Sequence, residues 1–180
     1  MENQKLKSMK LAKMAMLVAI SIVLVMIIHF PIFPAVAFLE YDPADIPILI
    51  GTFAFGPLAG ILLTAVVSVL QGLTVSAASG AYGIIMHLLA TTALVTVSGL
   101  IYRKHKTKKR AVIGLIAGTI AMAVVMFFAN MVVTPLFTGM PLAAIMKLMP
   151  FIVLFNIVKA GINSIVTFIV YKRISPFLHK

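Results

Sequence analysis

Apolar residues fill long stretches of this chain, and the charged residues lie between those stretches. Four of them are long enough to cross about 30 Å of hydrocarbon as a helix that rises about 1.5 Å per residue. They cover residues 11–28, 81–102, 111–133 and 149–171. The pattern therefore predicts an all-α integral membrane protein.

A further apolar stretch, residues 46–73, contains Gly56-Pro57 near its middle. A proline inside a helix clashes with the preceding turn and usually kinks or ends the helix. Read as one helix, the stretch brings the total to five spans; read as two, over 46–55 and 58–73, it brings the total to six. The first of the two is too short to cross lipid alone, so we expect the surrounding bundle to shelter it.

The positions of the basic residues favour six spans. All but two of the fifteen Lys and Arg residues lie at the N-terminus, in RKHKTKKR (103–110), or at the C-terminus with Lys172, Arg173 and Lys180. Loops on the cytoplasmic side carry the excess of Lys and Arg. Six spans place all three groups on that side, whereas five would place the two termini on opposite sides. We therefore predict one membrane domain over 1–180, a six-transmembrane-helix bundle with both termini cytoplasmic.

Composition agrees with a membrane protein and excludes several other classes. Hydrophobic residues make up 62% of the chain, charged residues 11%, and mean hydropathy is +1.16. The net charge of +11 does not indicate nucleic acid, because the basic residues flank apolar spans and are not interleaved with aromatic ones. The chain has no cysteine, and GTFAFG lacks the Lys and Ser or Thr of a phosphate-binding loop. We expect no enzymatic activity, no metal and no cofactor.

A few polar residues interrupt the predicted spans. Lys159 lies mid-span with Asn156 three residues before it and Asn163 four after it, so the three share one helical face. Asn130 lies near the outer end of the fifth span. Polar groups are costly in hydrocarbon and mark functional sites, and these donors suit ring carbonyls or a carboxylate. We expect no buried carboxylate beside Lys159. Alternatively, the Asn residues bond neighbouring helices and Lys159 extends to an interface.

Other polar residues lie close to the outer ends of spans. Gln71 ends the third span and His87 begins the fourth, and each either contacts a ligand or bonds a neighbouring helix. Tyr41 and Asp45 either close over a ligand or cap the second helix, with Asp45 as its N-cap. The outer loop gathers three of the four acidic residues, and we expect water or a ligand to reach them: Glu40, Asp42 and Asp45.

Small residues recur at helical spacing on two spans. Ala12, Ala15 and Ala19 form a stripe on the first span, and Gly114 and Gly118 form a GxxxG pattern on the fifth. Such patterns let two helices approach closely. The sequence leaves open whether the approaching helix belongs to this chain or to a partner.

In order and spacing, several segments resemble the substrate-binding S components of energy-coupling factor (ECF) vitamin transporters, especially the riboflavin branch. The likeness covers essentially the whole chain. It is carried by AMLVA (15–19), FLEYDPADIP (38–47), LIGTFAFGPLAG (49–60), ANMVVTP (129–135) and FNIVKAG (155–161).

The resemblance implies a function in the prokaryotic plasma membrane. An S component captures a small vitamin from outside and associates with a transmembrane coupling protein and two ATPase subunits. By motif, Asn130, Asn156 and Lys159 correspond to positions that hold polar ring atoms of the flavin in riboflavin binders. The alanine stripe corresponds to the surface that contacts the coupling protein.

Departures from the riboflavin pattern, including the outer loop TVSAASGAYG in place of a Pro-containing form, leave the vitamin open. Gln71-Gly72 stands where riboflavin binders usually carry Lys-Asn, and the acidic motif reads Asp-Pro-Ala-Asp. Related branches recognise pantothenate, or pyridoxine and hydroxymethylpyrimidine, and anionic pantothenate would favour Lys159. A stand-alone secondary transporter would require paired intramembrane carboxylates or an inverted repeat, and neither is visible in the sequence. In a membrane scaffold protein, Asn130, Asn156 and Lys159 would be incidental.

Overall fold

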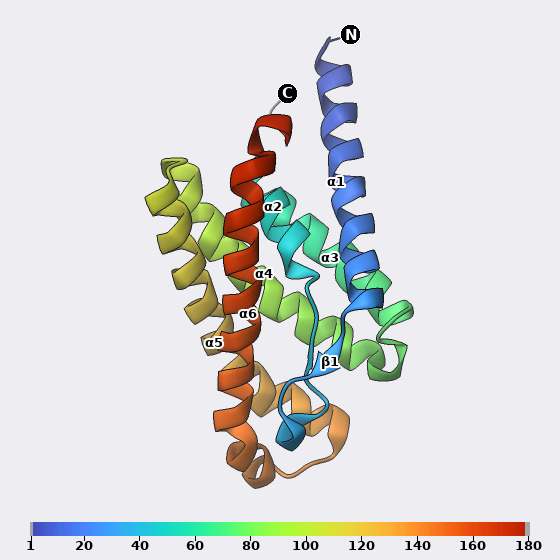
Figure 1. The fold of residues 1–180 in the computed structure, drawn as a ribbon. Coiled ribbons are helices and arrows are strands. Elements are labelled where there is room, and N and C mark those ends of the chain that lie inside the picture. The colour runs from blue at the N-terminus through green and yellow to red at the C-terminus, as the bar shows by residue number, and fades with distance from the viewer. Residues whose placement is uncertain (1, 179–180) are drawn as a thin grey trace.

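The computed structural model describes residues 2–178, and Lys180 of the C-terminal basic group lies outside them. Within that range the chain forms a bundle of six α-helices (Figure 1). Four of these helices, α1, α4, α5 and α6, are long and apolar enough to cross a membrane. The helices are α1 (Glu2–Ile27), α2 (Asp45–Phe55), α3 (Pro57–Leu73), α4 (Gly80–Lys104), α5 (Lys108–Thr138) and α6 (Leu142–Leu178).

The predicted break at Gly56-Pro57 is confirmed. Helix α2 ends at Phe55, and Pro57 begins α3, where its fixed φ suits the first helical position. Gly56 joins them with a φ of 95°, a conformation that residues with a Cβ rarely adopt. The stretch 46–73 is therefore two helices joined by a turn and not one kinked helix.

The long helices extend beyond the apolar stretches that predicted them. Helix α5 continues through Pro135 to Thr138, and α6 begins at Leu142, before Pro150, instead of at residue 149. Neither proline ends its helix. The apolar stretch gives the length that fits in hydrocarbon, whereas the helical hydrogen bonding continues past it.

Helix α2 lies inside the bundle, as its short length requires. Ten of its eleven residues are buried, and it contacts α1, α3, α4 and α6. Because other helices surround it, its backbone and side chains do not have to face lipid.

A short hairpin follows α1 and covers part of the bundle. Strands β1 (Phe30–Pro31) and β2 (Glu40–Tyr41) pair antiparallel, with the 3-10 turn η1 (Pro34–Val36) between them. Val36, Leu39 and Tyr41 pack with residues of α6 in a second apolar cluster: Ile145, Met149, Ile152 and Phe155. This packing fixes the segment that leads into α2.

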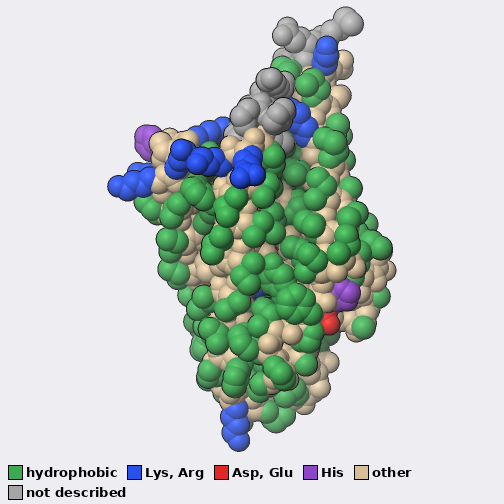
Figure 2. Space-filling view, in the orientation of Figure 1, with side chains coloured by type: hydrophobic (Ala, Val, Ile, Leu, Met, Phe, Trp, Pro, Cys, Tyr) green, Lys and Arg blue, Asp and Glu red, His purple; other side chains and the backbone are tan. Residues whose placement is uncertain are grey.

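The basic side chains are concentrated at one end of the molecule. The first turns of α1, the last turns of α6 and the α4–α5 turn lie at one end (Figure 1), and the Lys and Arg side chains that are visible in Figure 2 lie mostly there. The start of α6 lies at the opposite end (Figure 1), and Lys147, near that start, is exposed. Between the two ends the visible surface is mostly apolar.

The two small-residue patterns differ in their surroundings. Gly118 on α5 faces α4, where a Cβ atom would lie 2.7 Å from the carbonyl oxygen of Leu94 and still closer to the Ser98 hydroxyl. The glycine pattern therefore packs two helices of this chain. Ala12, Ala15 and Ala19 of α1 are all exposed, so their stripe is not covered by the described part of the chain.

Candidate functional site

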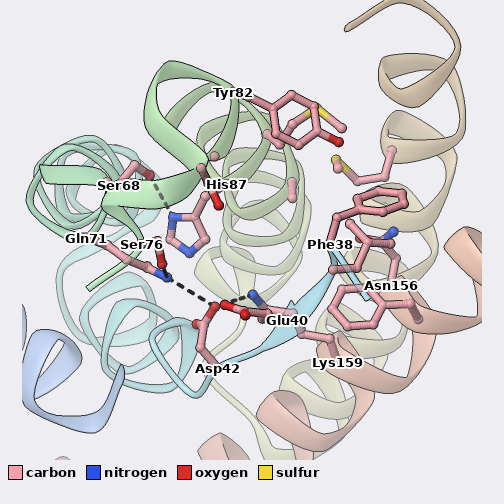
Figure 3. Close-up of a pocket in the computed structure, with 18 of the residues that line it drawn as sticks. Phe38, Glu40, Asp42, Ser68, Gln71, Ser76, Tyr82, His87, Asn156 and Lys159 are labelled. Atoms are coloured by element: carbon pink, nitrogen blue, oxygen red, sulfur yellow. Dashed lines mark hydrogen bonds and ion pairs between the residues drawn. The ribbon is translucent and has the colours of Figure 1, made fainter. Parts of the chain in front are cut away.

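A pocket opens beneath the hairpin, at a distance from the basic end of the molecule. It is lined by residues from the segment around β2, the end of α3, the turn η2 (Ala77–Ser79) and the helices α4, α5 and α6 (Figure 3). The pocket and its open mouth hold about 790 Å³ of empty space. Much of the wall is apolar or aromatic, with Phe38, Leu39, Tyr82, Met86, Met122, Met126 and Phe155.

Lys159 enters this pocket and is paired with a carboxylate. Its Nζ donates to Oδ2 of Asp42 at 2.7 Å, and both side chains are more than 90% buried. Gln71 Nε2 donates to the same oxygen at 3.3 Å, and Asp42 Oδ1 accepts the backbone N–H of Ala44 at 3.1 Å. The expectation that no buried carboxylate matches Lys159 is wrong.

Asp45 is also buried, and it is not the N-cap of α2. Ala44 occupies the cap position, and Asp45 is the first residue of the helix. Its Oδ1 accepts the Thr91 hydroxyl at 2.6 Å and its Oδ2 accepts Asn163 Nδ2 at 3.0 Å. Of the three acidic residues that we expected water or a ligand to reach, Asp42 is buried but lines the pocket, Asp45 is buried and does not line it, and only Glu40 is exposed. The other two turn inward because α4 and α6 supply donors for them.

Tyr41 links the hairpin to α6 and does not line the pocket. Its hydroxyl donates to Oδ1 of Asn163 at 3.0 Å, and Asn163 Nδ2 also donates to the Asp42 carbonyl at 3.1 Å. Burial raises the pKa of the Tyr41 hydroxyl, and the nearby Asp42 raises it further. The hydroxyl therefore remains protonated, and a donor, at neutral pH.

Gln71 and His87 both line the pocket, and each has a buried atom without a hydrogen bond. His87 Nδ1 is 2.7 Å from the Ser68 hydroxyl, while its Nε2 lies 3.6 Å from Asp45 Oδ1 without a hydrogen bond. Gln71 Oε1 also has no partner. Buried polar atoms are seldom left unpaired, so Gln71 Oε1 marks a position where a ligand can bond, whereas His87 Nε2 faces the buried Asp45 carboxylate.

The two asparagines have different surroundings. Asn156 lines the pocket and donates to the Ile152 carbonyl at 2.8 Å. Asn130 is fully buried and does not line the pocket in this structure: its Nδ2 donates to the Met126 carbonyl and its Oδ1 accepts from Thr134. Thr134 in turn contacts the hydroxyl of Tyr82, a pocket residue, at 3.0 Å. Asn130 is thus connected to the pocket through two side chains.

Sequence reasoning missed Asp42 and the aromatic walls. Asp42 and Lys159 are 117 residues apart, and no local pattern reveals that the loop folds the carboxylate inward. Asn163 was visible as a continuation of the Lys159 face, and it is the residue that joins Tyr41, Asp42 and Asp45.

The chemistry of this set is that of binding. Among the side chains that the structure describes, those of residues 4–174, no group of three or more His, Asp or Glu is placed to hold a metal ion. The pocket combines an ion-paired ammonium, an unpaired carbonyl oxygen, a histidine and flat apolar walls. Such a set can hold a planar molecule with polar ring atoms.

Comparisons with known proteins agree with this description. A family described as "ECF transporter, substrate-specific component" matches residues 9–171. The chain is 34% identical to the riboflavin transporter RibU of Staphylococcus aureus (strain TCH60), covering 95% of this chain and 93% of that protein. It is 27% identical to the riboflavin transporter FmnP of Bacillus subtilis (strain 168), with 97% and 96% covered.

A solved structure has the same fold. It is described as the S component of a bacterial ECF transporter, and it superposes with a TM-score of 0.83 at 33% identity. The match covers 97% of this chain and 99% of the other. The chain belongs to the family of substrate-specific S components of ECF transporters.

Proposed function

We propose that this protein captures riboflavin from outside the cell for import by an ECF transporter. The observation that carries the proposal is the set of polar atoms in the pocket. Lys159 supplies N–H donors, and Gln71 Oε1 supplies an acceptor without a partner. The flavin ring has carbonyl acceptors beside an imide N–H donor, so it can satisfy both. The relatives named as riboflavin transporters, 27% and 34% identical over nearly their full length, support the same ligand.

The walls of the pocket suit a flat ring system. Phe38, Phe155 and Tyr82 supply aromatic surface, and three methionines add flexible, polarizable contacts: Met86, Met122 and Met126. Asn156 and His87 complete the polar edge. Asn130, Tyr41 and Asp45 support these residues from behind in the ligand-free protein. Asn130 joins the ligand contacts if the Tyr82–Thr134 hydrogen bond opens.

The membrane arrangement belongs to the same proposal. The chain is one membrane domain with six spans, both termini are cytoplasmic, and the pocket opens outward. The gathering of basic side chains at the end that carries both termini supports this orientation. Helix α2 counts as a span that other helices shelter.

Transport requires partners, because we expect no ATPase activity of this chain. We propose that the exposed stripe of Ala12, Ala15 and Ala19 contacts the coupling transmembrane protein, which carries two ATPase subunits. The stripe is exposed in the described part of the chain, and small side chains let a helix of another protein approach closely.

Calorimetry on the purified, ligand-free protein against a panel of vitamins tests the ligand. Riboflavin should bind with submicromolar affinity, and protein purified without stripping should be yellow. Pantothenate, pyridoxine and hydroxymethylpyrimidine serve as the competing ligands. Tight binding of one of these without riboflavin binding would overturn the choice of vitamin, and no binding of any vitamin would overturn the function.

A further inference from the structure

We propose that a groove between α5 and α6 binds an anionic phospholipid, with an acyl chain along the groove and the headgroup beside Lys147. The groove is a second site, because it shares no lining residue with the pocket beneath the hairpin. The proposal concerns lipid binding and does not depend on which vitamin the protein captures.

The groove is apolar throughout and open along one side. Helix α6 lies beside α5 (Figure 1), and the groove with its open side holds about 770 Å³ of empty space. Met149 is buried in it, whereas Met146, Leu154 and Ile157 are exposed. Hydrocarbon can fill this space without leaving a polar group unpaired. The lining residues are Phe127 of α5 and, from α6, Met146, Met149, Pro150, Val153, Leu154 and Ile157.

The length of the groove matches one leaflet of a bilayer. Its lining residues on α6 run from Met146 to Ile157, a distance of about 16 Å along a helix that rises about 1.5 Å per residue. The hydrocarbon core of a bilayer is about 30 Å thick, so one leaflet contributes about half of that. The groove follows the axis of α6, a helix long and apolar enough to cross the membrane. A lipid chain that lies along it therefore has its headgroup at one end of the groove.

Lys147 gives that end of the groove a positive charge. It directly follows Met146, and its side chain is exposed. Among the side chains that the structure describes, it is the one exposed Lys or Arg that lies away from the basic end of the molecule. A lysine close to the end of a membrane helix extends its ammonium group to the interface, where lipid phosphates lie. The charge therefore favours a headgroup with a net negative charge.

Pro150 leaves a backbone acceptor at the same end. A proline has no N–H, so the Met146 carbonyl lacks the helical donor that residue 150 would otherwise supply. A headgroup with hydroxyl groups, such as that of phosphatidylglycerol, can donate to this oxygen. A choline headgroup has no such donor and is electrically neutral together with its phosphate. Phosphatidylglycerol and phosphatidylcholine are therefore the pair of lipids that tests the site.

A tryptophan in the groove can report the lipid beside it, because the chain has no tryptophan of its own. The ligand-free Phe127→Trp protein is reconstituted into mixtures of the two lipids, and the acyl chains of one or the other are brominated so that they quench the fluorescence on contact. Phosphatidylglycerol should bind about fivefold more strongly than phosphatidylcholine, the ratio expected for one lysine near a headgroup. Val132→Trp, at an exposed position of α5 that does not line the groove, is the control and should show nearly equal quenching by the two lipids.

Replacing Lys147 by Gln in the Phe127→Trp protein should bring the ratio close to one. The matched control is Lys172→Gln, which removes the same charge from an exposed position near the other end of α6 and should leave the ratio unchanged. Circular dichroism checks that both variants keep their helices.

Equal quenching by the two lipids at Phe127→Trp, or a preference that survives Lys147→Gln, would overturn the proposal. Quenching by neither lipid at Phe127→Trp would also overturn it, because protein, such as a second copy of the chain, would then cover the groove. Riboflavin capture is unaffected by any of these results.

Discussion

Side chains that line the pocket and side chains behind it form one connected group. Asp42 accepts from Lys159 and Gln71, while Asn163 donates to Asp45 and to the Asp42 backbone. A polar group in a membrane bundle is stable only when its partners are inside the bundle too. Each of these side chains is therefore held by neighbours from other helices, and changing one alters the orientation of the rest.

Replacing Lys159 by Met should weaken riboflavin binding by about 1.5 to 3 kcal/mol, the range for a hydrogen bond to a charged group. This corresponds to roughly a tenfold to 150-fold increase in Kd. The variant should also unfold at lower temperature, because Asp42 is left as a buried, unpaired charge. Calorimetry and thermal unfolding in detergent measure the two effects.

A double variant, Asp42→Asn with Lys159→Met, separates binding from folding. Removing both charges should recover most of the lost thermal stability while binding stays weak. If the single variant Lys159→Met bound riboflavin normally, Lys159 would be structural and not part of the ligand site.

Some of these residues could be read from the sequence and others could not. Lys159, Asn156 and Asn163 lie on one helix face, and the helical period predicted their shared direction. The inward turn of Asp42 depends on a loop between α1 and α2 whose path is set by contacts with α6, which lies more than a hundred residues away. Local patterns carry no information on such a path.

Helices meet each other in two ways in this fold. The glycines of α5 pack against α4 of the same chain, whereas the alanines of α1 are exposed on the surface of the bundle. The sequence predicted both patterns but not this difference, since a small-residue stripe looks the same whichever partner it meets. The Gly56-Pro57 turn, by contrast, was predictable because a proline acts on its own backbone.

Substituting Ala15 by Trp should block transport and leave riboflavin binding by the isolated protein close to normal. The side chain is exposed on α1, so we expect the fold to accommodate a larger one that prevents close approach of a coupling helix. Uptake by cells and calorimetry of the purified protein measure the two properties. Ile20→Trp, at another exposed position of α1, is the control for bulk alone. Joint loss of transport and binding would mean that the stripe supports the fold.

Substituting Gly118 by Val should destabilise the protein by about 1 to 3 kcal/mol, as overpacking of a core does. The new side chain would collide with Ser98 and with the backbone of Leu94, which cannot move without shifting α4. Gly161→Val is the matched control, because a Cβ at Gly161 meets nothing within 4 Å. Thermal unfolding of the two variants in the same detergent should differ clearly, and equal stability would contradict the close α4–α5 contact.

At the scale of the whole molecule, charge orders the fold along its long axis. The basic side chains gather at the end that holds the termini and the α4–α5 turn, whereas the pocket lies away from that end. The helix count follows from length, hydropathy and one turn. The side of the membrane on which the termini lie is inferred from the distribution of basic residues. It can be tested only with the protein in a membrane.

Single introduced cysteines test the orientation of the chain in the membrane. The chain has no cysteine of its own, so only the introduced thiol can react with a labelling reagent. A thiol at Lys106, in the α4–α5 turn, should react with a membrane-impermeant reagent only after the cells are opened. A thiol at Ala143, at the start of α6, should react in intact cells. The reverse labelling would place the α4–α5 turn outside and overturn the proposed orientation.

The hairpin over the pocket has one consequence for how the molecule is controlled. Two residues separate the end of α1 at Ile27 from the start of β1 at Phe30, whose ring lies 5.5 Å from that of Tyr41. The proposed docking helix and the cover of the pocket are therefore neighbours in the chain. If docking moves α1 enough to alter the hairpin, thermodynamic reciprocity applies: the factor by which the partner changes vitamin affinity equals the factor by which the vitamin changes partner affinity. Measuring either equilibrium gives the other.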